Sequence, residues 1–196
     1  MPTSSHTKLF TKSGCVQSLI LRFAAEVKRM DYILLDVDSH PALAARLGIT
    51  QAPALSDNYV TTGEIDILLE YMDEQHPSPA LLPPNVATRA VYRKQARSFH
   101  RDLFPLLAPA KAGDKQALNA LVAYLHQMNE ITQGFKYFAS NELSIMDVTV
   151  GPWLWTAKAS GLCLKQFKYL SCYADRLFAL PAFQACLRPA IDAEAA

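Results

Sequence analysis

The chain has 196 residues, of which 51% are hydrophobic and 19% charged, which excludes intrinsic disorder and leaves enough apolar side chains for a sizeable core. Nineteen basic against eighteen acidic residues give a formal net charge of +1, so no global field draws the chain to nucleic acid or acidic lipid, and we predict no direct DNA binding. No run approaches the roughly 18 apolar residues of a membrane span, and the first residues lack a secretory signal.

The four cysteines are scattered along the chain and form no CxxC pair. In a chain without export features they are typical of reduced thiols in the cytosol, so we expect a cytoplasmic protein. The five histidines show no metal-ligand spacing, and we expect no metal site. The cysteines are Cys15, Cys163, Cys172 and Cys186.

The first part of the chain alternates strand and helix patterns. A short strand is expected at residues 9–11, and apolar residues at the spacing of one helical face predict a helix over about 15–29. The apolar, partly β-branched run 32–37 is typical of a strand buried on both faces. Residues 41–47 predict a short helix that Gly48 ends.

Two short strands and a second clear helix follow. Residues 54–56 and 59–61 predict the strands, and the polar pair 57–58 predicts the turn between them. A helix is expected from about Glu64, and it ends before His76 because prolines follow at once.

Four prolines between positions 77 and 84 indicate a stiff, extended segment. We therefore predict a domain boundary there. The expected parts are an α/β domain over 1–78, a proline-rich linker over 79–86 and an all-helical domain over 87–196.

Beyond the linker every pattern is helical. Residues 88–104 predict one long helix that Pro105 ends or kinks. Asp114 is placed to cap another helix, and Ser144 with Asp147 three residues later has the pattern of a capping box. Further helices are expected at 167–179 and 181–187.

Four segments, together with the order of the elements, indicate a known fold. They are 52–55, 64–74, 144–147 and 177–187. The succession resembles the glutathione transferase fold, in which a thioredoxin-like α/β domain precedes an all-helical domain. Because the resembling families are dimers, the resemblance also implies a homodimer.

Further segments indicate a narrower group, and they are 70–83, 137–144 and 152–155. They resemble the stringent starvation protein A family, transcription factors carried by RNA polymerase, in which a surface proline–histidine–proline loop contacts the polymerase and its primary sigma factor. Pro77, Ser78 and Pro79 occupy the corresponding place, with serine where histidine is expected. The resemblance implies a regulator without catalytic activity that acts in stress or stationary phase. Its partners would be RNA polymerase holoenzyme with its sigma factor and a second copy or a related protein.

Cys15 is the sharpest candidate for catalysis. It begins a helix, where backbone N–H groups and the helix dipole favour a thiolate. Its place resembles that of the serine or cysteine that stabilises or bonds the sulfur of glutathione in glutathione transferases, which would make glutathione a cofactor here. The alternative is a small, half-buried thiol that only begins a helix, since no neighbouring histidine or lysine is evident from the sequence.

The rest of the glutathione-like pocket consists of Ala52, Pro53, Glu64 and Ile65. If the peptide bond before Pro53 is cis, the backbone of Ala52 is free to pair with an extended tripeptide, although such a proline also shapes the fold without a ligand. Glu64 matches an acid that holds the glutamyl end of glutathione, but with Thr61 it also has the pattern of a capping box. Ile65 stands where that motif has serine, so a hydrogen-bonding hydroxyl is missing.

The segment Pro77, Ser78 and Pro79 has two interpretations. It is either a rigid surface whose pre-ordered backbone lowers the entropy cost of docking a protein, or an ordinary linker between domains. Three hypotheses stay open: a regulator bound to RNA polymerase, a glutathione transferase that uses Cys15, and an interaction scaffold for another partner.

Overall fold

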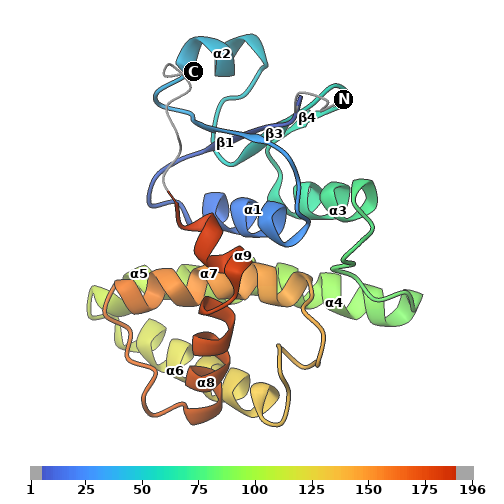
Figure 1. The fold of residues 1–196 in the computed structure, drawn as a ribbon. Helices are drawn as coiled ribbons and strands as arrows, with labels where there is room; N and C mark the ends of the chain where they lie inside the picture. The colour runs from blue at the N-terminus through green and yellow to red at the C-terminus, as the bar shows by residue number, and fades with distance from the viewer. Residues whose placement is uncertain (1–5, 189–196) are drawn as a thin grey trace. The chain divides into compact units, whose positions relative to one another are not determined.

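The computed structural model describes residues 6–188, which form two compact units. Unit 1 contains the described residues up to Pro79 and those from Pro181 onward, and unit 2 is Ala80–Leu180 (Figure 1). Unit 1 is an α/β domain and unit 2 is all-helical, so the predicted fold class is confirmed. Within the described residues, no helix is both long and apolar enough to cross a membrane.

Unit 1 is built on a mixed four-stranded sheet of order β2-β1-β3-β4. The strand β1 (Lys8–Thr11) pairs in parallel with β2 (Ile33–Asp36) and antiparallel with β3 (Ala54–Ser56). The short β4 (Thr61–Thr62) pairs antiparallel with β3. The parallel pair β1 and β2 is joined through a helix, as parallel pairing requires a crossover connection.

Helices cover both faces of this sheet. The helices α1 (Val16–Val27) and α3 (Ile65–Gln75) contact β1 and β3, and Figure 1 shows both on one side of the sheet with α2 (Pro41–Arg46) on the other. Alternation along β1 explains the two layers, since successive strand residues point to opposite faces. Phe10 therefore packs in a buried cluster with the α2 residue Ala44.

The strand β2 differs from its prediction. A strand buried on both faces was expected at 32–37, but Ile33 is 40% exposed. The reason is position: β2 is the edge strand of the sheet. The order of strands is set by pairings that the local pattern does not contain, so that prediction is wrong.

The second strand of the hairpin of β3 and β4 also differs from its prediction, in its bounds. The second strand was expected at 59–61 and is β4, one to two residues later. The cause is Asp57, whose Oδ1 accepts hydrogen bonds from the backbone N–H groups of Tyr59 at 2.8 Å and Val60 at 2.9 Å. This Asx-type turn holds both residues out of the ladder.

The last helix lies in a different unit from the one predicted. The range 87–196 was expected to form one helical domain, but α9 (Pro181–Cys186) belongs to unit 1 and packs on α1. The rings of Phe23 and Phe183 meet edge to face with centroids 4.9 Å apart, and both side chains are fully buried. A contact between residues 160 positions apart is beyond local patterns.

Unit 2 contains the remaining helices. The predicted helix over 88–104 is α4 (Val86–Ser98), capped by Asn85, followed by a π-helical turn (Phe99–Leu103) and a 3-10 turn (Phe104–Leu106) that contains Pro105. The others are α5 (Leu107–Lys111), α6 (Lys115–Thr132), α7 (Ile145–Ala159) and α8 (Lys168–Phe178). The predicted cap at Asp114 and the capping box of Ser144 and Asp147 are confirmed.

Candidate functional site

The sheet brings three of the predicted pocket positions to one edge. Phe10, next to the end of β1, pairs with Ala54 at the start of β3, and β4 runs back beside β3. The loop that leads from β1 to Cys15, the bond before Pro53, and Glu64 after β4 therefore lie at the same edge. The arrangement predicted by the resemblance is thus geometrically possible in this chain.

Cys15 occupies the N-cap position of α1. Its backbone is extended (φ −85°, ψ 118°), its N–H donates to the Lys12 carbonyl at 3.2 Å, and its side chain makes no capping hydrogen bond. The thiol is half-buried and free of disulfide bonding. Cys15 thus directly precedes the first turn of α1, whose backbone N–H groups have no partner within the helix.

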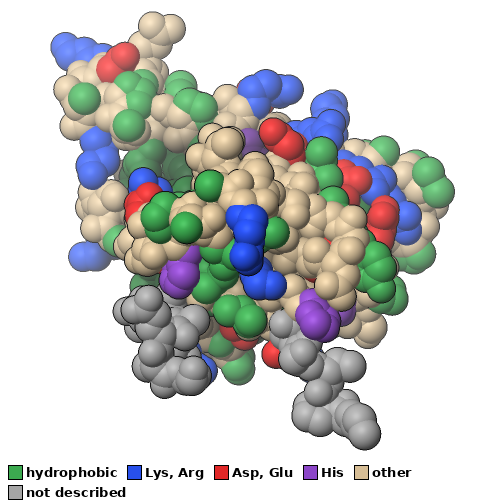
Figure 2. All heavy atoms as spheres, turned by 90° about the horizontal axis from the view of Figure 1, so that it is seen from above, with side chains coloured by type: hydrophobic (Ala, Val, Ile, Leu, Met, Phe, Trp, Pro, Cys, Tyr) green, Lys and Arg blue, Asp and Glu red, His purple; other side chains and the backbone are tan. Residues whose placement is uncertain are grey.

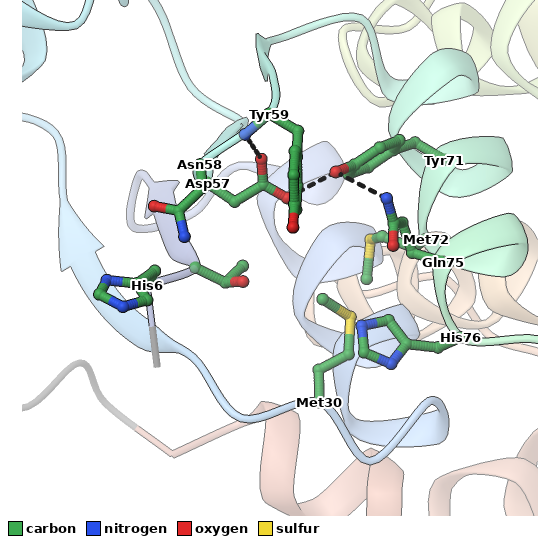
Figure 3. Close-up of a pocket in the computed structure, with 10 residues that line it drawn as sticks. His6, Met30, Asp57, Asn58, Tyr59, Tyr71, Met72, Gln75 and His76 are labelled. Atoms are coloured by element: carbon green, nitrogen blue, oxygen red, sulfur yellow. Dashed lines mark hydrogen bonds between the residues drawn. The ribbon is translucent and has the colours of Figure 1, made fainter. Parts of the chain in front are cut away.

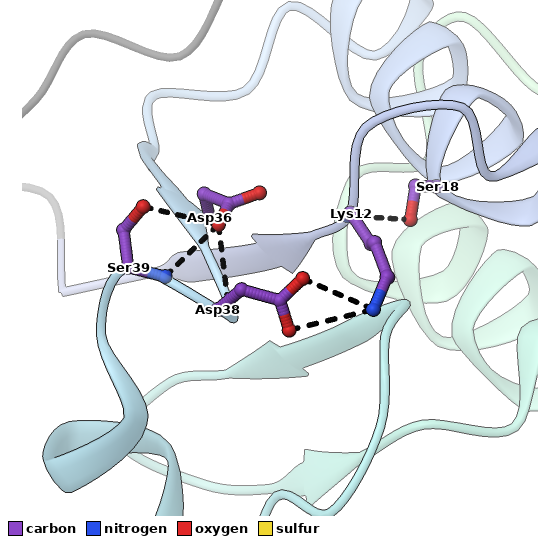
Figure 4. A network of polar contacts seen from close by, with 5 residues as sticks. All are labelled: Lys12, Ser18, Asp36, Asp38 and Ser39. Carbon is purple, nitrogen blue, oxygen red and sulfur yellow. Dashed lines mark hydrogen bonds and ion pairs between the residues drawn. The ribbon is translucent and has the colours of Figure 1, made fainter.

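A basic residue that the sequence analysis did not single out, Lys12, lies in the loop before Cys15. Its ammonium lies 3.0 Å from the Asp38 carboxylate, and its backbone N–H donates to the buried Ser18 hydroxyl at 3.0 Å (Figure 4). The hydrogen bond and charge of Asp38, with smaller charge effects of Asp36 and Cys15, raise the pKa of Lys12 above its ordinary value, although desolvation opposes this. The ammonium of Lys12 thus pairs with Asp38, whereas its contact with Cys15 is through the backbone.

The same network continues on the loop after β2. Asp36 Oδ1 accepts from the backbone N–H of Asp38 at 3.1 Å and of Ser39 at 3.0 Å, and from the Ser39 hydroxyl at 3.1 Å. Figure 4 shows Asp38 held between this turn and Lys12. A signal existed in the sequence, since Lys12 lies three residues before Cys15, but its partner Asp38 is brought close only by the β1–β2 pairing.

The peptide bond between Ala52 and Pro53, whose isomer the sequence left open, is cis. Pro53 is buried and Ala52 is half-buried. A Cβ atom at Gly63 would lie 3.1 Å from the Pro53 carbonyl oxygen, tighter than an ordinary contact. The chain before Glu64 therefore passes directly against the cis-proline turn.

Glu64 and Ile65 begin α3, but not with the predicted capping box. Glu64 is itself the N-cap residue, it is exposed, and its side chain makes no capping hydrogen bond. Thr61 lies in β4, where its hydroxyl is hydrogen-bonded to that of Ser56 at 2.9 Å, so the capping-box interpretation is wrong. Ile65 is only 8% exposed, so an apolar side chain packed into the core begins this helix.

A separate pocket of about 190 Å³ lies in unit 1 (Figure 3). Met30 lines it just after the end of α1, whereas Cys15 precedes the start of α1, so the pocket and the Cys15 edge are at opposite ends of a 12-residue helix. None of the predicted site residues lines it. The lining residues are His6, Thr7, Met30, Asp57, Asn58, Tyr59, Tyr71, Met72, Gln75 and His76.

A chain of hydrogen bonds forms one wall of this pocket. The Tyr71 hydroxyl donates to Asp57 Oδ2 at 2.6 Å, and Gln75 Nε2 donates to the Tyr71 oxygen at 3.2 Å. Burial and the negative charge of Asp57 raise the pKa of Tyr71 to about 12. The Asp57 carboxylate already accepts hydrogen bonds from the backbone of its turn and from Tyr71. We therefore interpret this wall as structural and not as a source of a catalytic acid.

The proline segment Pro77, Ser78 and Pro79 follows His76, at the end of α3 rather than at the Cys15 edge. All three residues are exposed, and the bond between Ser78 and Pro79 is cis. The predicted partner-binding residues are thus on the surface. Within residues 6–188, no three His, Cys, Asp or Glu side chains gather in a way that could hold a metal ion.

Comparisons with known proteins point in two functional directions. No family model matches the chain. It is 30% identical over 205 residues to maleylacetoacetate isomerase of Rattus norvegicus, with 94% of each chain covered. It is also 30% identical over 137 residues to a stringent starvation protein A homolog of Haemophilus influenzae. That match covers 67% of this chain and only 65% of the homolog. A tau class glutathione S-transferase from mango, Mangifera indica, has the same fold, with a TM-score of 0.81, 23% identity and coverage of 96% of this chain and 95% of that one.

Proposed function

This chain belongs to the glutathione transferase superfamily, and from that premise we propose that it is a regulator without catalytic activity that binds RNA polymerase holoenzyme, including its sigma factor, and modulates transcription under stress or starvation. It would act as a homodimer or with a related protein. The observation that carries the proposal is Ile65, a buried apolar side chain at the start of α3 where a glutathione site needs a hydroxyl.

The exposed proline segment supports a protein partner. Proline fixes its own φ and restricts the residue before it, so Pro77, Ser78 and Pro79 present a backbone with little freedom to lose on docking. On the face drawn in Figure 2, basic and acidic side chains are interspersed. A surface of mixed sign favours a protein partner over the phosphate backbone of DNA.

Co-purification tests the proposal. A tagged protein should capture RNA polymerase holoenzyme, and the double variant Pro77→Ala/Pro79→Ala should weaken that affinity by about tenfold or more, as loss of an interface centre does. Pro83→Ala/Pro84→Ala is the matched control, because it removes two prolines a few residues further on, and it should bind as the wild type does. Equal capture of RNA polymerase holoenzyme by both double variants would contradict a role of the segment Pro77, Ser78 and Pro79 in binding.

A second function is favoured by the place of Cys15 at the N-cap of α1. With the cis-proline turn at the same edge, Cys15 could activate or bond glutathione in a transferase or isomerase reaction. Millimolar glutathione should then raise the melting temperature, because a ligand that binds only the native state stabilises it by mass action. Cys15→Ala should abolish turnover. An unchanged melting temperature would exclude this second function.

A further inference from the structure

Lys28 is a lysine whose side chain is fully buried. It is the C-cap residue of α1, and its side chain is 0% exposed. Lysine is almost never buried unless its ammonium group is paired, because removing a charge from water is costly. The partners of this ammonium therefore define what the residue does.

Two groups from different parts of unit 1 meet at Lys28 Nζ. One is the Asp73 carboxylate in α3, whose side chain is 11% exposed and which forms an ion pair with the ammonium. The other is the carbonyl oxygen of Pro79, which accepts a hydrogen bond at 2.5 Å. One cation thus joins the end of α1, the last turns of α3 and the last residue of the exposed proline segment.

We propose that Lys28 is a positioning residue that fixes the proline segment in the conformation that docks onto RNA polymerase, an inference that rests on the proposed function. The segment leaves α3 at His76, and the Lys28 ammonium holds it at the carbonyl oxygen of Pro79. Between these two anchors Pro77 and Ser78 project to the surface. A charged donor in a buried place makes the stronger kind of hydrogen bond, and it leaves the Pro79 carbonyl one preferred orientation.

A purely structural role for Lys28 predicts something different. If the ammonium served only to join α1 to α3 through Asp73, an apolar pair of similar volume could replace the ion pair without loss, as is often found for buried ion pairs. The Pro79 carbonyl would lose its donor in that replacement, whereas the contact between the two helices would be kept. The two roles are therefore separable by a double substitution.

The test uses Lys28→Met together with Asp73→Leu in the full chain. Lys158→Met, which removes an exposed ammonium paired with Asp175, is the matched control. Three quantities are measured for each protein: the urea midpoint, the NMR relaxation order parameters of the Ser78 and Ala80 amides, and the affinity for RNA polymerase holoenzyme. Prolines carry no N–H, so these two amides report the backbone mobility of the segment.

We expect the double variant to keep the wild-type urea midpoint, to lower the order parameters of Ser78 and Ala80, and to bind the holoenzyme about tenfold more weakly, since one or two newly mobile backbone residues must be ordered on binding. Wild-type order parameters and wild-type affinity in the double variant would overturn the inference and leave the proposed function standing. Failure of the wild type to capture holoenzyme would overturn the proposed function, and the order parameters would then still decide whether Lys28 holds the segment.

Discussion

At the residue scale, Asp57 shows how one carboxylate fixes a turn and a helix together. It accepts from two backbone N–H groups of the β3–β4 turn and from the Tyr71 hydroxyl of α3. Burial alone would raise the pKa of Asp57, but the hydrogen bonds from Tyr71, Tyr59 and Val60 outweigh it and hold the pKa below the ordinary 3.8. The folded state therefore favours the ionised carboxylate.

The Tyr71–Asp57 hydrogen bond should stabilise the fold only within a pH window. Because the pKa of Asp57 is lower in the folded state than its unfolded value of 3.8, Asp57 contributes stability at pH values above 3.8. This contribution is lost as the pH falls through the folded pKa. The raised pKa of Tyr71 contributes stability below 10, which is lost as pH rises toward about 12. We expect Tyr71→Phe to lower the free energy of unfolding by about 0.5–1 kcal/mol at pH 7, a small value because Asp57 is only half-buried and keeps its two backbone donors.

Urea titrations at pH 7 and pH 3 measure this difference. At pH 3 the gap between the wild type and Tyr71→Phe should shrink, because Asp57 begins to take up a proton in both proteins. Tyr59→Phe is the control, since Tyr59 borders the same pocket but is 83% exposed, and it should change stability by less than about 0.5 kcal/mol. A gap that stays constant with pH would contradict the assignment.

At the element scale, local chemistry predicted where most helices begin but not which surfaces they cover. Asp114 and Ser144 were identified from short polar side chains just before apolar periodicity, and such caps act over three residues. The exposure of Ile33 and the packing of Phe183 depend on strand order and on contacts far apart in sequence. The Cys15 edge was predictable from motifs, whereas the burial of Lys28 was not, because α3 and the proline segment supply its partners.

The two confirmed caps should differ in strength because they differ in burial. Asp147 is fully buried and accepts hydrogen bonds from the N–H groups of Phe138 and Ser144 and from the Ser144 and Tyr173 hydroxyls. Asp147→Ala should cost about 3 kcal/mol, since several buried donors lose their acceptor. Asp114→Ala should cost about 1 kcal/mol, the usual value for an exposed N-cap.

Tryptophan fluorescence in urea measures both variants, because the two tryptophans, Trp153 and Trp155, lie in α7. The comparison is internal, because both substitutions remove an aspartate that accepts hydrogen bonds from backbone N–H groups at the start of a helix of unit 2. Equal losses would mean that the buried network around Asp147 adds nothing to an ordinary cap.

The contact between α1 and α9 should be essential to unit 1. Phe183→Ala removes a fully buried ring from its edge-to-face contact with Phe23, which should cost about 3–5 kcal/mol. Phe135→Ala is the matched control, because Phe135 is 43% exposed, and its loss should stay below about 0.5 kcal/mol. Far-UV circular dichroism in urea gives both values. A small loss of unfolding free energy for Phe183→Ala would show that the contact between α9 and α1 contributes little to the stability of unit 1.

At the scale of the whole molecule, the four thiols divide by environment. Cys163 and Cys172 in unit 2 are exposed, Cys15 is half-buried, and Cys186 in α9 is buried with its thiol directed at the Phe183 carbonyl, 3.0 Å away. Burial, with a smaller contribution from Glu26 and an opposing one from Arg22, raises the pKa of Cys186 to about 12. Because the thiolate is the reactive form, one chain carries thiols of very different reactivity.

Labelling of the native protein with Ellman's reagent at pH 8 should therefore proceed in stages. Cys163 and Cys172 should react first, Cys15 more slowly, and Cys186 only when unit 1 opens, since its sulfur is inaccessible and protonated in the folded state. Mass spectrometry of the quenched protein assigns each stage. In Phe183→Ala the Cys186 stage should accelerate while the Cys163 and Cys172 stage stays unchanged, because that substitution loosens α9 and leaves unit 2 intact. Reaction of Cys186 together with the exposed thiols in the wild type would mean that α9 is not held on α1, and the assignment of α9 to unit 1 would fail with it.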